Sequence, residues 1–138
     1  MKRQWIIRTY IALFAGPGKC RIQKTEKGMK SSPILSLSCE VPFTHYFFND
    51  DQSSVIRALK ARAKSYSSAN VDFFNKDCNL VVDELLQKLS SNSLDFCFIE
   101  PFDWEIKYNS IWKLTEKRRM DSAVTFHRSK RLCACGKY

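Results

Sequence analysis

Small and acidic residues that could hold a ligand recur at the ends of apolar segments in this 138-residue chain. The first apolar run, Tyr10 to Phe14, is followed at once by Ala-Gly-Pro-Gly, which contains Gly16 and Gly18. Glycine lets a ligand or a second backbone come close, because it has no side chain and tolerates positive φ. An apolar strand that ends in such a turn is how nucleotide sites begin in α/β folds, although an ordinary tight turn has the same composition.

Carboxylates follow three further apolar runs. Asp50 and Asp51 come after the second run, Asp77 after the third, and Glu100 after the fourth. A carboxylate after the second strand can accept hydrogen bonds from the hydroxyls of a ribose. Each acid could instead be a turn or cap residue, and one of Asp50 and Asp51 is expected to be the N-cap of the next helix. Together with the glycine turn, these positions favour a nucleoside-bearing ligand over a purely structural pattern.

Alternating strands and helices would bring these positions together. Apolar runs predict strands at residues 6–14, 44–48, 70–74, 94–99 and 121–126. Amphipathic or capped segments predict helices at 52–66, 80–89 and 108–117 and a further helix that starts at Ser32 and Pro33. Residues 19–31 are polar and aperiodic, so they are predicted to be a loop. The pattern predicts an α/β, Rossmann-like parallel sheet of strand order 3-2-1-4-5, with its ligand at the carboxyl ends of the strands.

Two of the helices have a defined apolar face. In the first, Ser32 is expected to be the N-cap and Pro33 to open the helix. Its buried residues are predicted to be Ile34, Leu35 and Leu37. In the second, the 3.6-residue period predicts a buried face, with basic residues pointing away from it. The residues of that face are Val55, Ile56, Leu59 and Ala63.

The net charge is +9, from 23 basic and 14 acidic residues, and it is unevenly distributed. Residues 1–30 hold eight basic residues and a single acid, Glu26, and residues 117–119 and 128–131 form a second basic zone. Such a field attracts polyanions and speeds their association. A solvated basic surface without a partner is an equally open interpretation.

The remaining composition bears on the compartment. No apolar run approaches the ~20 residues that span a bilayer. The N-terminus does not have the pattern of a signal peptide, so we expect a cytoplasmic protein without a membrane partner. Cys39, Cys78 and Cys97 fall in or beside predicted helices and strands, where reduced thiols act as small hydrophobes. Cys133 and Cys135 have no second Cys/His pair at ligand spacing, so no metal site is expected.

The motifs in combination resemble a known family. They are Phe-Ala-Gly-Pro-Gly at 14–18, Ser-Pro at 32–33, an acid after the second strand, Asp-Cys at 77–78 and Ile-Glu-Pro-Phe at 99–102. Over nearly the whole chain to about residue 126, this series resembles the three-Cys-motif partner family, TcmP. That family is similar to class I S-adenosylmethionine-dependent methyltransferases. The three cysteines of its name belong to a neighbouring partner protein that is similar to radical-S-adenosylmethionine enzymes.

The resemblance implies S-adenosylmethionine as the cofactor. The turn with Phe14, Gly16 and Gly18 would approach the methionine part of that molecule. Asp50 or Asp51 would hold the ribose, and Asp77 would lie near the adenine amino group.

The resemblance also implies a catalytic segment, formed by Glu100, Pro101 and Phe102. Glu100 would accept a hydrogen bond from a target amine and Phe102 would stack on the target. Positioning an amine near the methyl carbon accounts for much of the rate in such a transfer, so no strong general base is required.

The likeness ends near Phe126. Residues 127–138 are a basic segment without strand alternation or a helical stripe. We therefore expect a partial Rossmann-like domain over residues 1–126 and an irregular basic tail over 127–138. Because relatives continue with further strands and helices, the chain is expected to be a truncated or frame-shifted product, with a genuine short form as the alternative.

Three functions follow from these observations. The first is a methyltransferase-like protein that binds S-adenosylmethionine, acts on nucleic acid or an amine and is inactive alone. The second is a non-catalytic or degenerate protein that acts through its three-Cys-motif neighbour. The third is a basic nucleic-acid-binding module, although most aromatic residues lie in predicted strands, which favours a core over a stacking platform.

Overall fold

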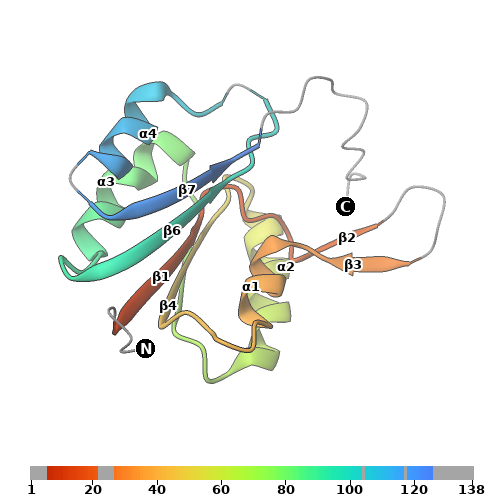
Figure 1. Ribbon diagram of the computed structural model, residues 1–138. Coiled ribbons are helices and arrows are strands. Elements are labelled where there is room, and N and C mark those ends of the chain that lie inside the picture. Colours follow the sequence, from red (N-terminus) through yellow and green to blue (C-terminus); the bar gives the residue numbers. More distant parts are fainter. Residues whose placement is uncertain (1–5, 22–26, 104, 117, 126–138) are drawn as a thin grey trace.

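Five parallel strands form the central sheet of the protein (Figure 1). A computed structural model describes residues 6–21, 27–103, 105–116 and 118–125 of the chain. The strands of the sheet are β1 (Ile7–Ala12), β4 (His45–Asn49), β5 (Val71–Phe74), β6 (Ser93–Ile99) and β7 (Met120–Val124). Their order is β5-β4-β1-β6-β7, and all four neighbouring pairs are parallel. The predicted parallel sheet and its 3-2-1-4-5 order are therefore confirmed.

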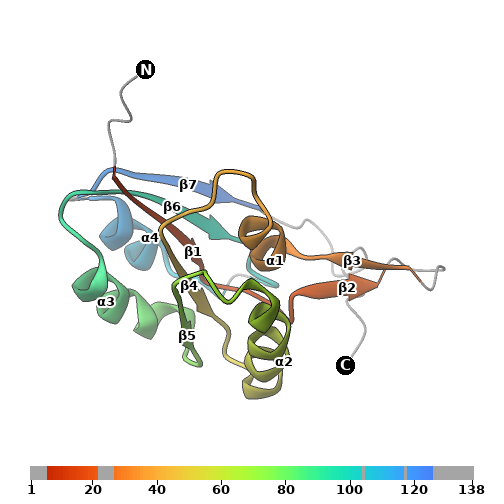
Figure 2. The same ribbon diagram turned by 90° about the horizontal axis from the view of Figure 1, so that it is seen from below.

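Two helices cover each face of the sheet. The helices α1 (Ser32–Leu37) and α2 (Ser53–Ala63) pack on one face, and α3 (Cys78–Lys88) and α4 (Tyr108–Thr115) pack on the other (Figures 1 and 2). A short 3-10 helix, η1 (Lys64–Tyr66), continues α2. This arrangement is the one that α-helical crossovers between parallel strands produce, because each crossover returns over a face of the sheet.

The central strand β1 supplies side chains to both cores. Tyr10 and Ala12 pack with α1 and α2, whereas Ile11 and the residue directly after the strand, Leu13, pack with α3 and α4. All four are almost completely buried. A strand that is covered on both faces needs apolar residues at every position, which explains the unbroken run in the sequence.

Residues 19–31 are not a simple loop, and that prediction was wrong. They contain an antiparallel hairpin of β2 (Lys19–Arg21) and β3 (Gly28–Lys30), which forms a separate two-stranded sheet. Each strand has three residues and the sequence has no alternating apolar face, so the usual signal for a strand is missing. Figure 2 shows the hairpin projecting beyond the body of the central sheet.

The first helix differs from its prediction by one position. Its N-cap is Ser31 rather than Ser32, and Ile34 and Leu37 are buried while Leu35 is 53% exposed. With six residues, the helix makes fewer than two turns, and Pro33 and Ser36 are buried beside Ile34 and Leu37, so Leu35 is the position that points away from the sheet. The buried face predicted for α2 is confirmed in full.

The last strand, β7, pairs only with β6 among the described residues. It ends at Val124, two residues before the predicted end. The predicted tail at 127–138 lies outside the described residues, as does the end of the predicted 1–126 domain. Among the helices that the structure describes, none has the length and hydrophobicity to cross a bilayer.

Candidate functional site

A pocket of about 210 Å³ opens at the edge of the sheet formed by the carboxyl ends of β1, β4 and β5. We call it the edge pocket. Its lining residues are Leu13, Phe14, Asn49, Asp51, Lys76, Asp77, Cys78 and Glu105. The connections that follow β1, β4 and β5, which are far apart in the sequence, thus meet at this pocket together with the segment before α4. In open α/β sheets, ligands bind at this edge, near the point where the strand order reverses.

The first wall of the edge pocket is the turn after β1, which Asp50 holds in place. Gly16 has a φ of 68° and its N–H donates to Asp50 Oδ2 at 3.1 Å. The other carboxylate oxygen, Oδ1, accepts from the Gln52 N–H at 3.0 Å. Asp50 therefore fastens the β1 turn to the β4 turn, and Asp51 beside it is the carboxylate that lines the pocket.

Neither acid after β4 is the N-cap of α2, contrary to expectation. Gln52 occupies that position, and Asp50 reaches only its N–H, two residues away in the sequence. Burial raises the pKa of the Asp50 carboxyl, and the hydrogen bonds from Gln52 and Gly16 partly offset that rise. The role of Asp50 in this geometry is to position the turn.

Asn49, which the sequence did not single out, joins the three turns. Its side chain is buried, with 2% of the residue exposed. Its Nδ2 donates to the Leu13 carbonyl at 3.1 Å and to the Lys76 carbonyl at 3.0 Å, and its Oδ1 accepts from the Lys76 N–H at 3.2 Å. A buried amide with these partners satisfies backbone groups of two other connections and fixes their spacing. The sequence signal that could have indicated this role is the polar Asn that directly follows the apolar residues Tyr-Phe-Phe in the second strand.

A further wall of the edge pocket is formed by the start of α3. Asp77 is the N-cap of this helix, because its Oδ1 accepts from the Asn79 N–H at 2.8 Å. Asn79 then binds the segment before α4: its Nδ2 donates to the Glu105 carbonyl at 3.0 Å, and its Oδ1 accepts from the Lys107 N–H at 2.8 Å. Glu105 is thereby brought to a pocket whose other lining residues come from earlier turns.

The edge pocket is acidic although the protein as a whole is basic. Burial raises the pKa of the Glu105 carboxyl, and the negative charges of Asp51, Asp103, Asp50 and Asp77 raise it further. Carboxylates whose charges act on Glu105 in this way lie close enough to it to create a shared negative potential. Such a site favours a cationic ligand or one with hydroxyl donors, and it disfavours phosphate.

The lysine and the cysteine that line the edge pocket do not change its acidic character. Lys76 lines the pocket, but its ammonium is paired with Glu84 on α3. Burial raises the pKa of the Cys78 thiol to about 11, with further contributions from Asp77 and Glu105, so the thiol is protonated at neutral pH. Within the described ranges, no group of three or more His, Cys, Asp or Glu residues is placed to hold a metal ion.

Gly18 has a structural role in this geometry. Its φ is 86°, and a Cβ on it would stand 2.8 Å from Ile34 Cγ1 and 3.0 Å from Leu59 Cδ1. The residue therefore lets the chain pass between α1 and α2. It does not line the edge pocket.

The segment Glu100, Pro101 and Phe102 follows β6 but does not line the edge pocket. Pro101 is buried, Glu100 is exposed, and Phe102 is 60% exposed. Of the expected site residues, the structure thus brings Phe14, Asp51 and Asp77 together at the edge pocket. Gly16 and Asp50 bind each other in the adjoining turns, whereas Gly18 and the segment 100–102 do not line the pocket.

Comparisons with known proteins add no assignment. No protein-family model, curated protein or solved structure matches this chain.

Proposed function

We propose that this protein binds S-adenosylmethionine in the edge pocket and is a methyltransferase-like protein of the three-Cys-motif partner type. One observation carries the proposal. Asp51 after β4, Asp77 after β5 and Phe14 after β1 line the same pocket at the carboxyl edge of a sheet with order 3-2-1-4-5. This placement matches the roles that the resemblance implies for the ribose, the adenine and the methionine part.

The charge of the pocket supports the same ligand. S-adenosylmethionine carries positive charge on its sulfonium and ammonium groups, and its ribose hydroxyls can donate to carboxylates. An acidic pocket attracts the cation, and Asp51 offers acceptors to the hydroxyls. The pocket volume of about 210 Å³ is below the ~300–1,000 Å³ of typical ligand sites, so the ligand would be partly enclosed and would bind weakly.

The bound cofactor would supply an electrophilic methyl group. In this proposal, Glu100 accepts a hydrogen bond from a target amine of a nucleic acid or another substrate, and the exposed face of Phe102 stacks on the target. Because this segment does not line the edge pocket, we infer that the chain is inactive alone. A three-Cys-motif neighbour protein would be the partner that completes the site.

A thermal-shift titration tests the cofactor. With a Kd of about 100 μM, 5 mM ligand stabilises the native state by roughly 2.3 kcal/mol, which corresponds to a rise in Tm of roughly 6–9 °C. Asp51→Asn should reduce the shift. Glu40→Gln removes one exposed carboxylate from the segment after α1 and should leave it unchanged. A folded wild-type protein without a shift at 5 mM would contradict the proposal.

A further inference from the structure

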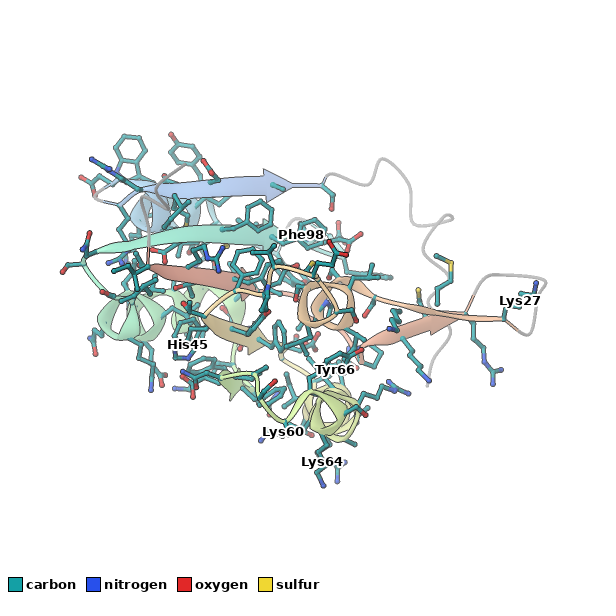
Figure 3. All side chains as sticks on the ribbon, turned by 60° about the horizontal axis from the view of Figure 1, so that its bottom comes forward. Lys27, His45, Lys60, Lys64, Tyr66 and Phe98 are labelled. Atoms are coloured by element: carbon teal, nitrogen blue, oxygen red, sulfur yellow. The ribbon has the colours of Figure 1, made fainter. Side chains whose placement is uncertain are left out.

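Two basic segments that are distant in the sequence meet on the side of the molecule that carries α1 and α2. The first is the β2–β3 hairpin, and the second is α2 with η1. They are in contact: Arg62 donates to the Pro17 carbonyl at the base of the hairpin, and Lys30 Nζ lies 3.4 Å from the Tyr66 hydroxyl. Figure 3 shows Lys27 toward the far end of the hairpin and Lys60 and Lys64 on the outer side of the helix.

Among the residues that the structure describes, seven exposed cations belong to these two segments, and we call them together the basic surface. They are Lys19, Arg21, Lys27, Lys30, Arg57, Lys60 and Lys64. Residues 52–71 contain no acid at all. The ion pairs that join described residues are His45–Asp72, Lys76–Glu84, Lys113–Asp83 and Arg118–Asp95, and none of them includes a cation of the basic surface.

The hairpin holds like charges against one another. Lys19 and Lys30 are direct partners in the register of β2 and β3. Like charges opposite each other on neighbouring strands destabilise a hairpin. On α2, Arg57, Lys60 and Lys64 follow a spacing of three and four residues, which places them along one face and also close together. A bound polyanion would relieve both repulsions.

We propose that the basic surface binds double-stranded DNA, with the hairpin in the major groove and α2 against the phosphate backbone. A two-stranded ribbon fits the major groove, which is about 12 Å wide. The hairpin projects from the body of the sheet, so it can enter a groove while α2 remains at its rim (Figure 2). The acidic edge pocket repels phosphate, so the duplex is directed to this surface rather than to the pocket.

This proposal does not depend on cofactor binding, since no residue of the basic surface lines the edge pocket. A membrane is the less suitable partner. Surface-bound segments insert large apolar side chains beneath their cations. On the hairpin, among the residues that the structure describes, Met29 is the one large hydrophobic that is strongly exposed, at 52%.

Binding of the full chain to a labelled 20-base-pair DNA duplex, followed by fluorescence anisotropy from 50 to 200 mM NaCl, tests the proposal. About five phosphate contacts predict a slope of log K against log salt near −4.5, which is roughly a 500-fold loss of affinity over this range. Each contact that is removed weakens binding about eightfold at 0.1 M salt and lowers the slope by about one.

The decisive variant replaces Lys19, Lys27 and Lys64 by glutamine. Its matched control replaces Lys88, Lys107 and Lys113, which lie at α3 and α4 and change the net charge equally. The first triple variant should lose affinity by at least tenfold relative to the control, and circular dichroism should show both folded. Arg57→Gln with Lys60→Gln provides a second variant that leaves the hairpin intact and should also weaken binding.

Three results would overturn the proposal. The first is no binding to the duplex at 50 mM salt. The second is an equal loss of affinity in the two triple variants, which would mean that net charge alone is responsible. The third is tighter binding to duplex RNA of equal length or to phosphatidylserine vesicles, because the deep, narrow major groove of RNA excludes the ribbon and a membrane has no groove.

Discussion

Replacing Gly18 by alanine should destabilise the fold by an amount that the geometry of the turn defines. The φ of 86° lies in the left-handed region, which costs a residue with a Cβ roughly 1–2 kcal/mol. The new methyl group would also stand 2.8 Å from Ile34 Cγ1 and 3.0 Å from Leu59 Cδ1. Both neighbours are buried, so they have little room to move, and overpacking of this kind costs about 1–3 kcal/mol.

The sum is a loss of roughly 2–5 kcal/mol in the free energy of unfolding. Gly16 is a matched control, because its φ of 68° is also left-handed but a Cβ on it would have no atom within 4 Å. Gly16→Ala should therefore cost only the roughly 1–2 kcal/mol of the backbone. Both substitutions restrict the unfolded chain by the same small amount, so this effect cancels in the comparison.

Urea denaturation, followed by circular dichroism, measures both variants under the same conditions. We expect a lower midpoint for Gly18→Ala than for Gly16→Ala, with unchanged m-values. Equal losses would show that the methyl group at position 18 is accommodated without cost. The packing of the β1 turn between α1 and α2 would then be different from the one described.

Three further predictions concern other parts of the molecule. Arg118→Met should lower the free energy of unfolding, measured by urea denaturation, by roughly 3–5 kcal/mol, because the fully buried Asp95 carboxylate loses its ion-pair partner. A loss below about 1 kcal/mol would contradict this prediction. Cys97, whose pKa burial raises to about 12, should resist iodoacetamide at pH 8 in the folded protein, whereas the exposed Cys39 reacts, as peptide mass spectrometry can show. Burial and the neighbouring carboxylates raise the pKa of Glu105 in the folded protein, so its contribution to stability is present below its unfolded pKa and is lost as the pH rises through the folded pKa. Glu105→Gln should therefore raise the free energy of unfolding relative to wild type at pH 7 but not at pH 3. Equal effects of the substitution at both pH values would contradict the raised pKa.

The inner strands of the sheet were predictable because they are covered on both faces. Most positions of such a strand are apolar, and the runs around Ile11, Phe47 and Cys97 stand out from the polar sequence between them. The strand order then follows from short, right-handed crossovers. The hairpin was not predictable in the same way, since its two strands pack no apolar face and are held together by their antiparallel backbone pairing.

The candidate site was predictable in position but not in detail. Parallel strands guarantee that the residues after β1, β4 and β5 meet at one edge, so acids at those positions had to be neighbours. Which acid faces the pocket depends on the backbone of each turn: Asp50 turns back to the Gly16 N–H, and Asp51 faces the pocket. Glu105 reaches the pocket through the side chain of Asn79, a long-range contact that no sequence pattern signals.

Binding of S-adenosylmethionine at the edge pocket can be observed by titrating the ¹⁵N-labelled protein with the ligand and recording two-dimensional NMR spectra. We expect saturable chemical-shift changes for the amides of Phe14, Asp51, Asp77 and Glu105 up to millimolar ligand, while the amides of β7 stay unchanged. A well-dispersed spectrum without changes at these amides, or with changes confined to β7 or the hairpin, would contradict it.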